Sequence, residues 1–345
     1  MTPRESVEAV LKGQIPARIP FTVYESKIPR CAVERMLRNR GACIVQRNVP
    51  AYKTAWPNVK IVSHTFVENE KQLVRTEYET PHGVLYTISE NAGFTTWTHK
   101  KIFTNRDDYK AILFLINDMR FIENYKNLAY AQEADGGDSF FRPYLALEPM
   151  QQLISEDMGT ETFCTEWFDN QDEILKLYDA LVAKRREIYP LCANAPVMAF
   201  NYGGNVTPEI LGVERFEKYY VPNYNEAADV LHKNGKLIGV HFDANCKLIA
   251  RSIAKTRLDY IEAFTPAPGT DMTLAEARSA WPDKILWINF PSVIHLEPVE
   301  EVRLATRELL TQVGSYERFI MGITEDIPEN RWRETIPAIV DVLWK

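Results

Sequence analysis

The second half of the chain alternates between short apolar runs and longer segments that have helical periodicity. The apolar runs cover residues 196–202, 236–241, 258–262, 284–289 and 318–323. Tight turns can join antiparallel strands, whereas neighbouring parallel strands need a long crossover, usually a helix. The alternation therefore predicts a parallel α/β sheet. Enough chain precedes these runs to complete an eightfold (β/α)8 TIM barrel, which is the fold that we predict.

The first part of the chain has a different sequence pattern. Residues 3–13 have the pattern of a helix that ends at Gly13, and the prolines that follow extend the chain into an entry strand. From Cys31 to about Asn105, segments rich in β-branched and aromatic residues predict antiparallel hairpins, with a turn at residues 81–83. We therefore expect an N-terminal helical and β-hairpin elaboration beside the barrel.

A length of 345 residues is compatible with one barrel domain that carries such an elaboration. We expect a single domain over residues 1–345. Residues 1–135 would hold the elaboration and the first barrel elements, and residues 136–345 would hold the regular strand–helix units.

Composition and charge exclude several classes of protein. The formal net charge is −7 and no tract is rich in Lys and Arg, which argues against a nucleic acid as the main partner. No apolar run reaches the roughly 18 residues that a membrane-spanning helix needs, and the N-terminal helix lacks the apolar core of a signal peptide. Five cysteines without a CxxC pair fit buried free thiols in a reducing cytoplasm. We therefore expect a cytoplasmic enzyme that acts on a small molecule, and a homodimer is compatible with this composition.

Two neighbouring apolar runs each deliver a polar side chain where the run ends. His241 follows one run and Glu262 ends the next. Parallel strands joined by a helix end at the same edge of the sheet, where α/β barrels place their active sites. His241 and Glu262 are therefore our leading candidates for catalysis, although a core histidine and a solvated glutamate explain the pattern equally well.

Other polar side chains also lie at or just after the predicted strand ends. We expect contacts to substrate from Asn201, Tyr202, Asp243, Asn289 and Glu325. Tyr202 is also a candidate for the catalytic group. Aromatic side chains that could line a pocket, or could equally belong to the core, are Tyr24, Trp97, Phe200, Tyr202, Phe242 and Phe264.

A zinc site is chemically compatible with these groups. Catalytic zinc takes three protein ligands of the His, Asp, Glu or Cys type and keeps one position open. The third ligand besides His241 and Glu262 could be Glu226, Asp243 or Glu325. Periodicity does not rank them, because a helix residue, a turn residue and a charge at a helix N-terminus each have an ordinary structural explanation.

Other chemistries lack a sequence signature. The chain contains no GxxxxGK[ST] or GxGxxG phosphate loop and no GxSxG nucleophile motif. Cys246 stands at the predicted start of a helix, where packing is the usual reason for a cysteine.

Three segments together resemble one superfamily. They are TPRESVEAVLKGQIPARIPF, VERFEKYYVPNYNEAADVLHKNGKLIGVHFDAN, and RFIMGI followed by DIPENRW. They resemble the uroporphyrinogen decarboxylase superfamily, over nearly the whole chain and most strongly from residue 196 onward. The resemblance implies a (β/α)8 barrel. True porphyrinogen decarboxylases carry an Arg-rich motif near the N-terminus, and FTVYESKIPR stands there instead, which argues against that reaction.

One branch of this superfamily comprises zinc-dependent methyltransferases that work with a corrinoid protein. In that branch a His-x-Cys follows one strand, a Glu follows the next, and a Cys follows the last. His241 and Glu262 match this pattern, whereas Asp243 and residues 323–325 stand where the cysteines would be. The spacing of Glu226, His241 and Glu262 is similar to the zinc ligands of methyltransferase components of O-demethylases.

The resemblance thus implies a function. Zn²⁺ held by Glu226, His241 and Glu262 would help move a methyl group from an aryl methyl ether, as in veratrol, to the Co(I) corrinoid (cobalamin) of a partner protein. A nitrogen and oxygen ligand set makes zinc more Lewis-acidic than thiolates do and suits an oxygen leaving group. The alternatives are a metal-free decarboxylase of the same fold, a methylcorrinoid:thiol methyltransferase, and a non-catalytic partner of the corrinoid protein.

Overall fold

The computed structural model describes residues 1–93 and 95–345, which fall into two units. The barrel unit comprises Met1–Ala51, Tyr125–Ala146 and Ala193–Lys345, and the inserted unit comprises Tyr52–Asn124 and Leu147–Cys192.

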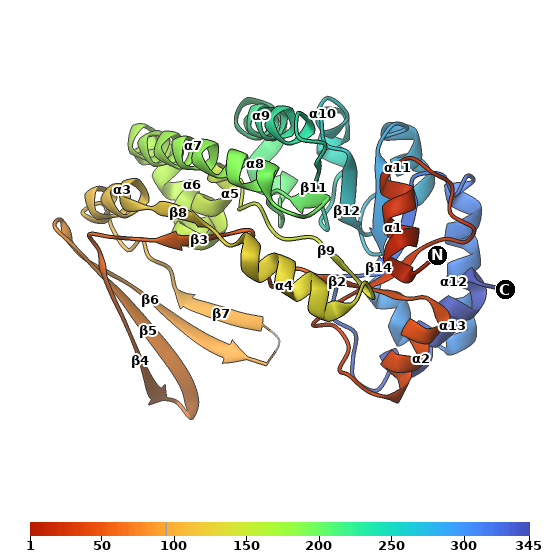
Figure 1. Cartoon of the computed structure of the whole chain (residues 1–345). Coiled ribbons are helices and arrows are strands. Elements are labelled where there is room, and N and C mark those ends of the chain that lie inside the picture. The colour runs from red at the N-terminus through yellow and green to blue at the C-terminus, as the bar shows by residue number, and fades with distance from the viewer. Residues whose placement is uncertain (94) are drawn as a thin grey trace. The chain divides into compact units, whose positions relative to one another are not determined.

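Eight parallel strands form the sheet of the barrel unit (Figure 1). In spatial order they are β10 (Ala199–Asn201), β11 (Leu237–His241), β12 (Tyr260–Phe264), β13 (Ile285–Asn289), β14 (Phe319–Ile323), β1 (Phe21–Tyr24), β2 (Cys43–Gln46) and β9 (Ser139–Phe141). An isolated parallel bridge joins Tyr144, three residues past β9, to Asn201 of β10, and Leu145 N donates to Asn201 O at 2.7 Å. The sheet therefore closes, and the predicted α/β TIM barrel is confirmed.

Helices connect the barrel strands, as the alternation predicts. They are α1 (Pro3–Leu11), α2 (Ala32–Arg40), α4 (Tyr125–Asp135), α8 (Pro208–Arg215), α9 (Val221–His232), α10 (Ala250–Ala254), α11 (Leu274–Ala280), α12 (Val299–Val313) and α13 (Trp332–Leu343), with shorter turns η2 (Phe216–Tyr220), η3 (Lys247–Ile249) and η4 (Ser292–Leu296). A capping box formed by Thr273 and Glu276 begins α11.

Residues 214–232 form one helical segment, in which the π-helical turn η2 links α8 to α9. Pro222 lies just after this turn and has no N–H to donate to the preceding carbonyl groups, which accounts for an irregular ladder at this point.

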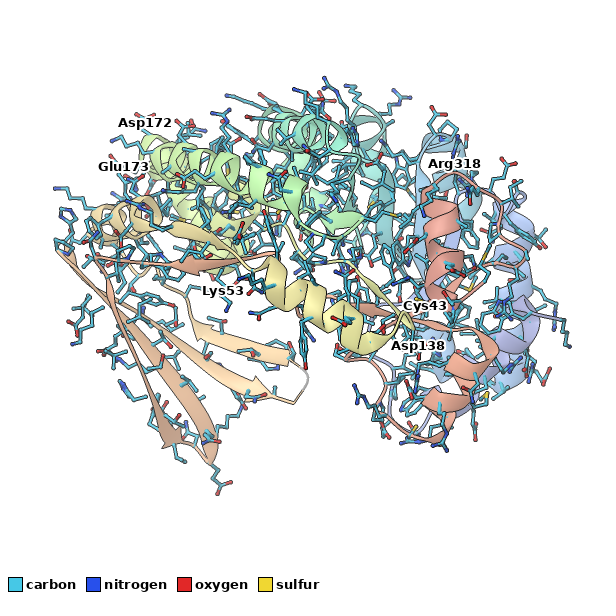
Figure 2. All side chains as sticks on the ribbon, in the orientation of Figure 1. Cys43, Lys53, Asp138, Asp172, Glu173 and Arg318 are labelled. Atoms are coloured by element: carbon cyan, nitrogen blue, oxygen red, sulfur yellow. The ribbon has the colours of Figure 1, made fainter. Side chains whose placement is uncertain are left out.

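The core fills the barrel interior and reaches α1. The main apolar cluster combines Val7, Val10, Leu11, Tyr24, Cys43, Val45, Phe140, Ala199, Tyr260, Ile285, Trp287 and Ile320. Gly239 of β11 is required inside it, because an added Cβ would lie 2.1 Å from the Tyr260 ring. Cys43 begins β2 beside the loop that carries Asp138, and its Sγ lies 3.9 Å from the Asp138 carbonyl oxygen (Figure 2).

The inserted unit contains the predicted antiparallel hairpins. One sheet has the order β4 (Lys60–Glu68), β5 (Lys71–Thr80), β6 (Gly83–Ala92) and β7 (Thr95–Lys100), and β3 (Tyr52–Ala55) pairs with β8 (Arg120–Glu123). Its helices are α3 (Asp108–Asp118), α5 (Pro149–Gln152), η1 (Leu153–Met158), α6 (Thr160–Asp169) and most of α7 (Gln171–Asn194).

The boundary of this elaboration differs from the prediction. The hairpins were expected from Cys31 onward, but Cys43–Gln46 is the second barrel strand. A four-residue strand is too short for periodicity to separate a buried parallel strand from a hairpin strand.

The five cysteines are all free thiols. Cys43, Cys192 and Cys246 are buried as expected, whereas Cys164 is exposed and Cys31 is partly exposed. Across residues 1–93 and 95–345, we find no helix with the length and apolar character needed to span a membrane.

Candidate metal centre

His241 is the last residue of β11 and lies buried at the C-terminal end of the barrel. The apolar run Leu237–Val240 forms the strand, and the polar ring follows where the strand ends. The chain after β10 passes close to the ring, because a Cβ at Gly204 would lie 3.0 Å from the His241 Cβ. Glycine at 204 therefore leaves room for the imidazole.

Glu262 faces His241 from the neighbouring strand. The two residues are paired in the parallel register of β11 and β12, and His241 Nδ1 lies 2.9 Å from Glu262 Oε2. A register shift after Glu262, with Ala263 at φ 58°, forms a bulge directly beside this pair. The structure therefore brings together the two residues that the sequence predicted as a pair.

The Glu262 carboxylate is fully buried and receives several donors. Asn201 Nδ2 donates to Oε2 at 2.8 Å, Arg142 Nη2 lies 3.2 Å from Oε1, and the Tyr24 hydroxyl donates to Oε1. Burial alone would raise the pKa of Glu262, but the charge of Arg142 and the contact with His241 outweigh burial and lower it to about 2. Glu262 is therefore ionised, and Asn201, Arg142 and Tyr24 hold its carboxylate in place.

Tyr24 and Arg142 complete this buried network. Arg142 Nη2 donates to the Tyr24 hydroxyl at 3.0 Å, and neither Arg142 nor Glu262 has any side-chain exposure. Burial, followed by the nearby Glu262 charge, raises the pKa of Tyr24, so its hydroxyl keeps its proton and can donate it. From the sequence, Tyr24 was expected only as an aromatic side chain of the pocket or of the core, and Arg142 was not expected in the site. Each residue lies at or just after the end of a barrel strand, which is the signal that selected His241.

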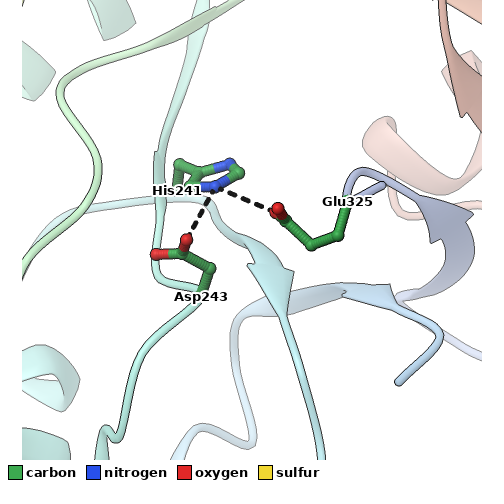
Figure 3. Close-up of side chains that lie close together, drawn as sticks. All are labelled: His241, Asp243 and Glu325. Carbon is green, nitrogen blue, oxygen red and sulfur yellow. Dashed lines mark ion pairs between the residues drawn. The ribbon is translucent and has the colours of Figure 1, made fainter. Parts of the chain in front are cut away.

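The other ring nitrogen of His241 faces two acidic side chains (Figure 3). His241 Nε2 lies 3.4 Å from Asp243 Oδ2 and 3.6 Å from Glu325 Oε1. One ligand atom from each of the three residues lies within 4.8 Å of the others. Side-chain exposure increases from 9% at His241 through 27% at Asp243 to 37% at Glu325, so this group is open on the Glu325 side.

The charges around this group favour a bound cation. Burial disfavours a charged His241 ring, but Glu262 and Asp243 outweigh burial and raise the pKa of His241 well above its ordinary value. Burial also raises the pKa of Glu325. In the described part of the chain, no partner reaches the buried Asp243 Oδ1. A cation next to Nε2 would relieve the mutual repulsion of the two carboxylates.

The distances from His241 Nε2 to the Asp243 and Glu325 carboxylates fit a divalent metal ion. In a tetrahedral zinc site with bonds of about 2.0–2.2 Å, two ligand atoms are roughly 3.3–3.6 Å apart. The distances from His241 Nε2 to the two carboxylates lie in this range. A metal-bound histidine usually donates its other ring N–H to a carboxylate, and Glu262 stands in that position. Residues His241, Asp243 and Glu325 therefore fit a zinc ion.

The predicted ligand Glu226 is a partly exposed residue of α9 and is not part of the group that His241 forms with Asp243 and Glu325 in the described part of the chain. Glu262 reaches the ring on the Nδ1 side, away from the group formed with Asp243 and Glu325. Of the three ligands expected from spacing, the structure thus brings two together and leaves out Glu226.

The remaining predicted substrate contacts are engaged inside the protein. Asn201 binds Glu262. Asn289 Nδ2 donates to Thr265 Oγ1 at 3.2 Å, and its Oδ1 accepts from Thr324 N at 2.9 Å. Tyr202 is fully buried and packs edge-to-face on Tyr224, with ring centroids 5.6 Å apart. These side chains therefore support the walls of the site.

Comparison with known proteins gives a likeness in fold only. No protein-family model and no curated protein matches the chain. Among solved structures, a methyltransferase from Methanosarcina mazei has a TM-score of 0.59 and 11% sequence identity, and the match covers 99% of this chain and 98% of that one. A pneumococcal exo-β-D-N-acetylglucosaminidase has a TM-score of 0.41 at 10% identity, over 93% of this chain and 83% of that one, which is too weak a match to interpret.

Proposed function

We propose that this chain is a zinc-dependent methyltransferase that moves a methyl group from an aryl methyl ether to the Co(I) corrinoid of a partner protein. The full-length likeness in fold to a methyltransferase supports the type of reaction. The resemblance of the sequence to corrinoid-dependent enzymes supports a corrinoid as the methyl acceptor. The nitrogen and oxygen ligand set supports an ether as the methyl donor.

The proposed zinc ligands are His241, Asp243 and Glu325. The observation that carries this choice is the position of His241 Nε2, 3.4 Å from Asp243 and 3.6 Å from Glu325. Asp243 and Glu325 are preferred to Glu226 as ligands, because both lie on the Nε2 side of the ring. Glu262 is proposed as a positioning residue, since it lies on the Nδ1 side and has no exposure.

Bound zinc would supply Lewis-acid stabilisation to the phenolate oxygen as the leaving group. Glu262 holds the His241 ring with its Nδ1 proton toward β12, so that Nε2 keeps its lone pair for the metal. Asp243 and Glu325 border the more exposed side, where the ether can enter. The Co(I) of the partner's corrinoid would supply the electron pair for the new bond to the methyl carbon, and the electron pair of the broken C–O bond would stay on the phenolate.

The test is methyl transfer from a methoxybenzoate to Co(I) cobalamin, measured for the zinc-loaded parent, the chelated parent and His241→Ala. We expect turnover in the zinc-loaded parent, and its loss after chelation and in His241→Ala. His232→Ala is the matched control, because His232 lies on α9 and pairs with Asp259 at 2.8 Å. It should keep both zinc and activity.

Two other outcomes would reject the proposal. Turnover of a carboxylated substrate that survives chelation would favour the metal-free decarboxylase. Transfer from methylcobalamin to a thiol, without transfer from any ether, would favour the thiol methyltransferase.

A further inference from the structure

Strand β4 is the open edge of the four-stranded sheet in the inserted unit (Figure 1). It is a regular strand of nine residues that pairs with β5, and no other strand of the described residues pairs with its far side. Every residue of β4 except Phe66 is exposed. The outer backbone groups of β4 are therefore available to another strand.

This edge lacks most of the usual protection against pairing. Proteins generally protect edge strands with proline, bulges, short length or charged side chains, and β4 carries Lys and Glu only at its two ends, as Lys60 and Glu68. β4 contains no proline, and its register with β5 is continuous from Lys60 to Glu68. The opposite edge, β7, is shorter and has a register shift where it meets β6. β4 is thus the edge of this sheet that is built to accept a strand.

The hairpin turn determines which backbone groups point outward. Asn69 and Glu70 both have positive φ, at 49° and 63°, as in the two-residue turns typical of hairpins. In such a hairpin the closing pair, here Glu68 and Lys71, exchanges hydrogen bonds. Alternate residues then direct their N–H and C=O groups away from β5, and these are Ile61, Ser63, Thr65 and Val67.

The sequence of β4, KIVSHTFVE, is complementary to itself when read in the antiparallel direction about His64. The facing pairs are Lys60 with Glu68, Ile61 with Val67, Val62 with Phe66, and Ser63 with Thr65. Each pair matches in character: opposite charges, two apolar pairs and two hydroxyls. Opposite charges and apolar side chains that face each other stabilise antiparallel pairing.

Neighbouring registers lose this match. Facing residues must both point their backbone groups outward or both inward, so the register can shift only by two residues. One such shift sets Lys60 against Phe66, and the other sets Glu68 against Val62. The register centred on His64 is therefore the favoured one.

We propose that a second copy of this chain binds along β4 in this register, so that two four-stranded sheets join into one of eight strands. The occupant is a second copy because the strand is complementary to itself, and a two-fold axis through His64 satisfies both halves with the same contacts. The pairing covers Val67, Ile61 and Val62, which are 73%, 41% and 37% exposed in the single chain.

Charge reversal tests the register. Lys60→Glu places like charges at both ends of the paired strands, and Glu68→Lys does the same with the opposite sign. We expect each variant to weaken dimerisation by about tenfold or more, measured by sedimentation equilibrium over a wide concentration range. Lys53→Glu, an exposed lysine of β3 in the same unit (Figure 2), is the matched control and should dimerise like the parent.

Mixing the two variants gives the sharper result. When Lys60→Glu pairs with Glu68→Lys, opposite charges face each other at both ends, so the mixture should form a heterodimer more tightly than either variant dimerises alone. The double variant Lys60→Glu with Glu68→Lys should also dimerise. Lys60 bonds Glu79 of its own chain at 2.7 Å, and both the single and the double variant lose that bond. Recovery in the double variant can therefore come only from contacts between copies.

A backbone test is independent of charge. Thr65→Pro removes one outward N–H while keeping the inward groups that bond β5. We expect it to abolish the dimer with an unchanged circular dichroism spectrum, and we expect amide exchange in the parent dimer to be slow at Ser63, Thr65 and Val67. A monomeric parent, a Lys60→Glu variant that dimerises like the parent, or a mixture that stays monomeric would overturn the proposal. Protection of β4 only after addition of a corrinoid protein would overturn it too and would assign the edge to that partner.

Discussion

His241 and Glu262 are direct neighbours across two parallel strands, and the Nδ1–Oε2 distance between them is 2.9 Å. Register determines this contact, because a shift of one residue would turn either side chain to the opposite face of the sheet. The contact uses one nitrogen of the ring and leaves the other for Asp243 and Glu325. The strand pairing thus decides which side of His241 can bind a metal ion.

Glu262→Gln should weaken both the fold and the metal site. The substitution leaves the charge of Arg142 buried without its carboxylate, which typically costs about 3–5 kcal/mol of unfolding free energy. It also replaces the carboxylate that orients His241 with a neutral amide, which is a weaker acceptor, so zinc affinity should fall about 10–100-fold. Denaturant unfolding and competitive zinc titration measure the two effects.

The double variant Arg142→Met with Glu262→Gln separates these effects. Removal of both charges should restore part of the lost stability, because no unpaired charge stays buried. Zinc affinity should stay low, since the orienting carboxylate is still missing. Equal stability of the single and double variants would contradict the charge balance described for Arg142.

Three isosteric variants should distinguish the ligand set His241, Asp243 and Glu325 from the set His241, Glu262 and Glu226. Glu325→Gln and Asp243→Asn should each lower zinc affinity by more than the roughly 10–100-fold expected for a group outside the ligand set. Glu226→Gln should leave zinc content unchanged. Zinc stoichiometry by elemental analysis measures this, and loss of zinc in Glu226→Gln alone would restore the ligand set that spacing suggests.

Asp157 should make the stability of the protein depend on pH. Burial, with a smaller contribution from the Glu156 charge, raises the pKa of Asp157 to about 7, against about 3.9 in an unfolded chain. The folded state therefore holds this proton more tightly. The stabilisation is fully present below about pH 4 and is lost as the pH rises towards 7.

Asp157→Asn should remove this dependence. The free energy of unfolding of the variant should equal that of the parent near pH 4. Near pH 8 it should be higher than that of the parent by on the order of a few kcal/mol, measured by denaturant unfolding at both pH values. Glu156→Gln removes only the neighbouring charge and should give a smaller change of the same sign. A parent that is no less stable at pH 8 than Asp157→Asn would contradict the pKa.

The sequence was sufficient to predict the second half of the barrel and the pair at its centre. Strands β10 to β14 alternate with helices, so the position of His241 at the end of β11 follows from the pattern alone. Glu262 was expected to end its strand, whereas it lies in the middle of β12, two residues before the strand ends. The choice of the third metal ligand did not follow from the pattern. The sequence left Asp243 and Glu325 open beside Glu226, and spacing along the chain does not show which acidic side chains lie beside the His241 ring in the folded protein.

The first half of the barrel was harder to predict for a physical reason. Strands β1, β2 and β9 have four, four and three residues, and the inserted unit interrupts them. Such short runs carry almost no periodicity. Tyr24 and Arg142 were therefore not recognised as strand-end residues of the site, although they satisfy the rule that selected His241.

The bridge between Tyr144 and Asn201 has a consequence for the order of folding. The inserted unit supplies chain on both sides of β9, between β2 and β9 and again between β9 and β10. Two long loops must close before β9 can dock, and loop closure costs more entropy as length increases. We therefore expect the contact between the β9 segment and β10 to form last and to open first in native-state hydrogen exchange. Arg142 and Asn201, which hold Glu262, lie on the two sides of this contact, so the site would be completed only in the last step of folding.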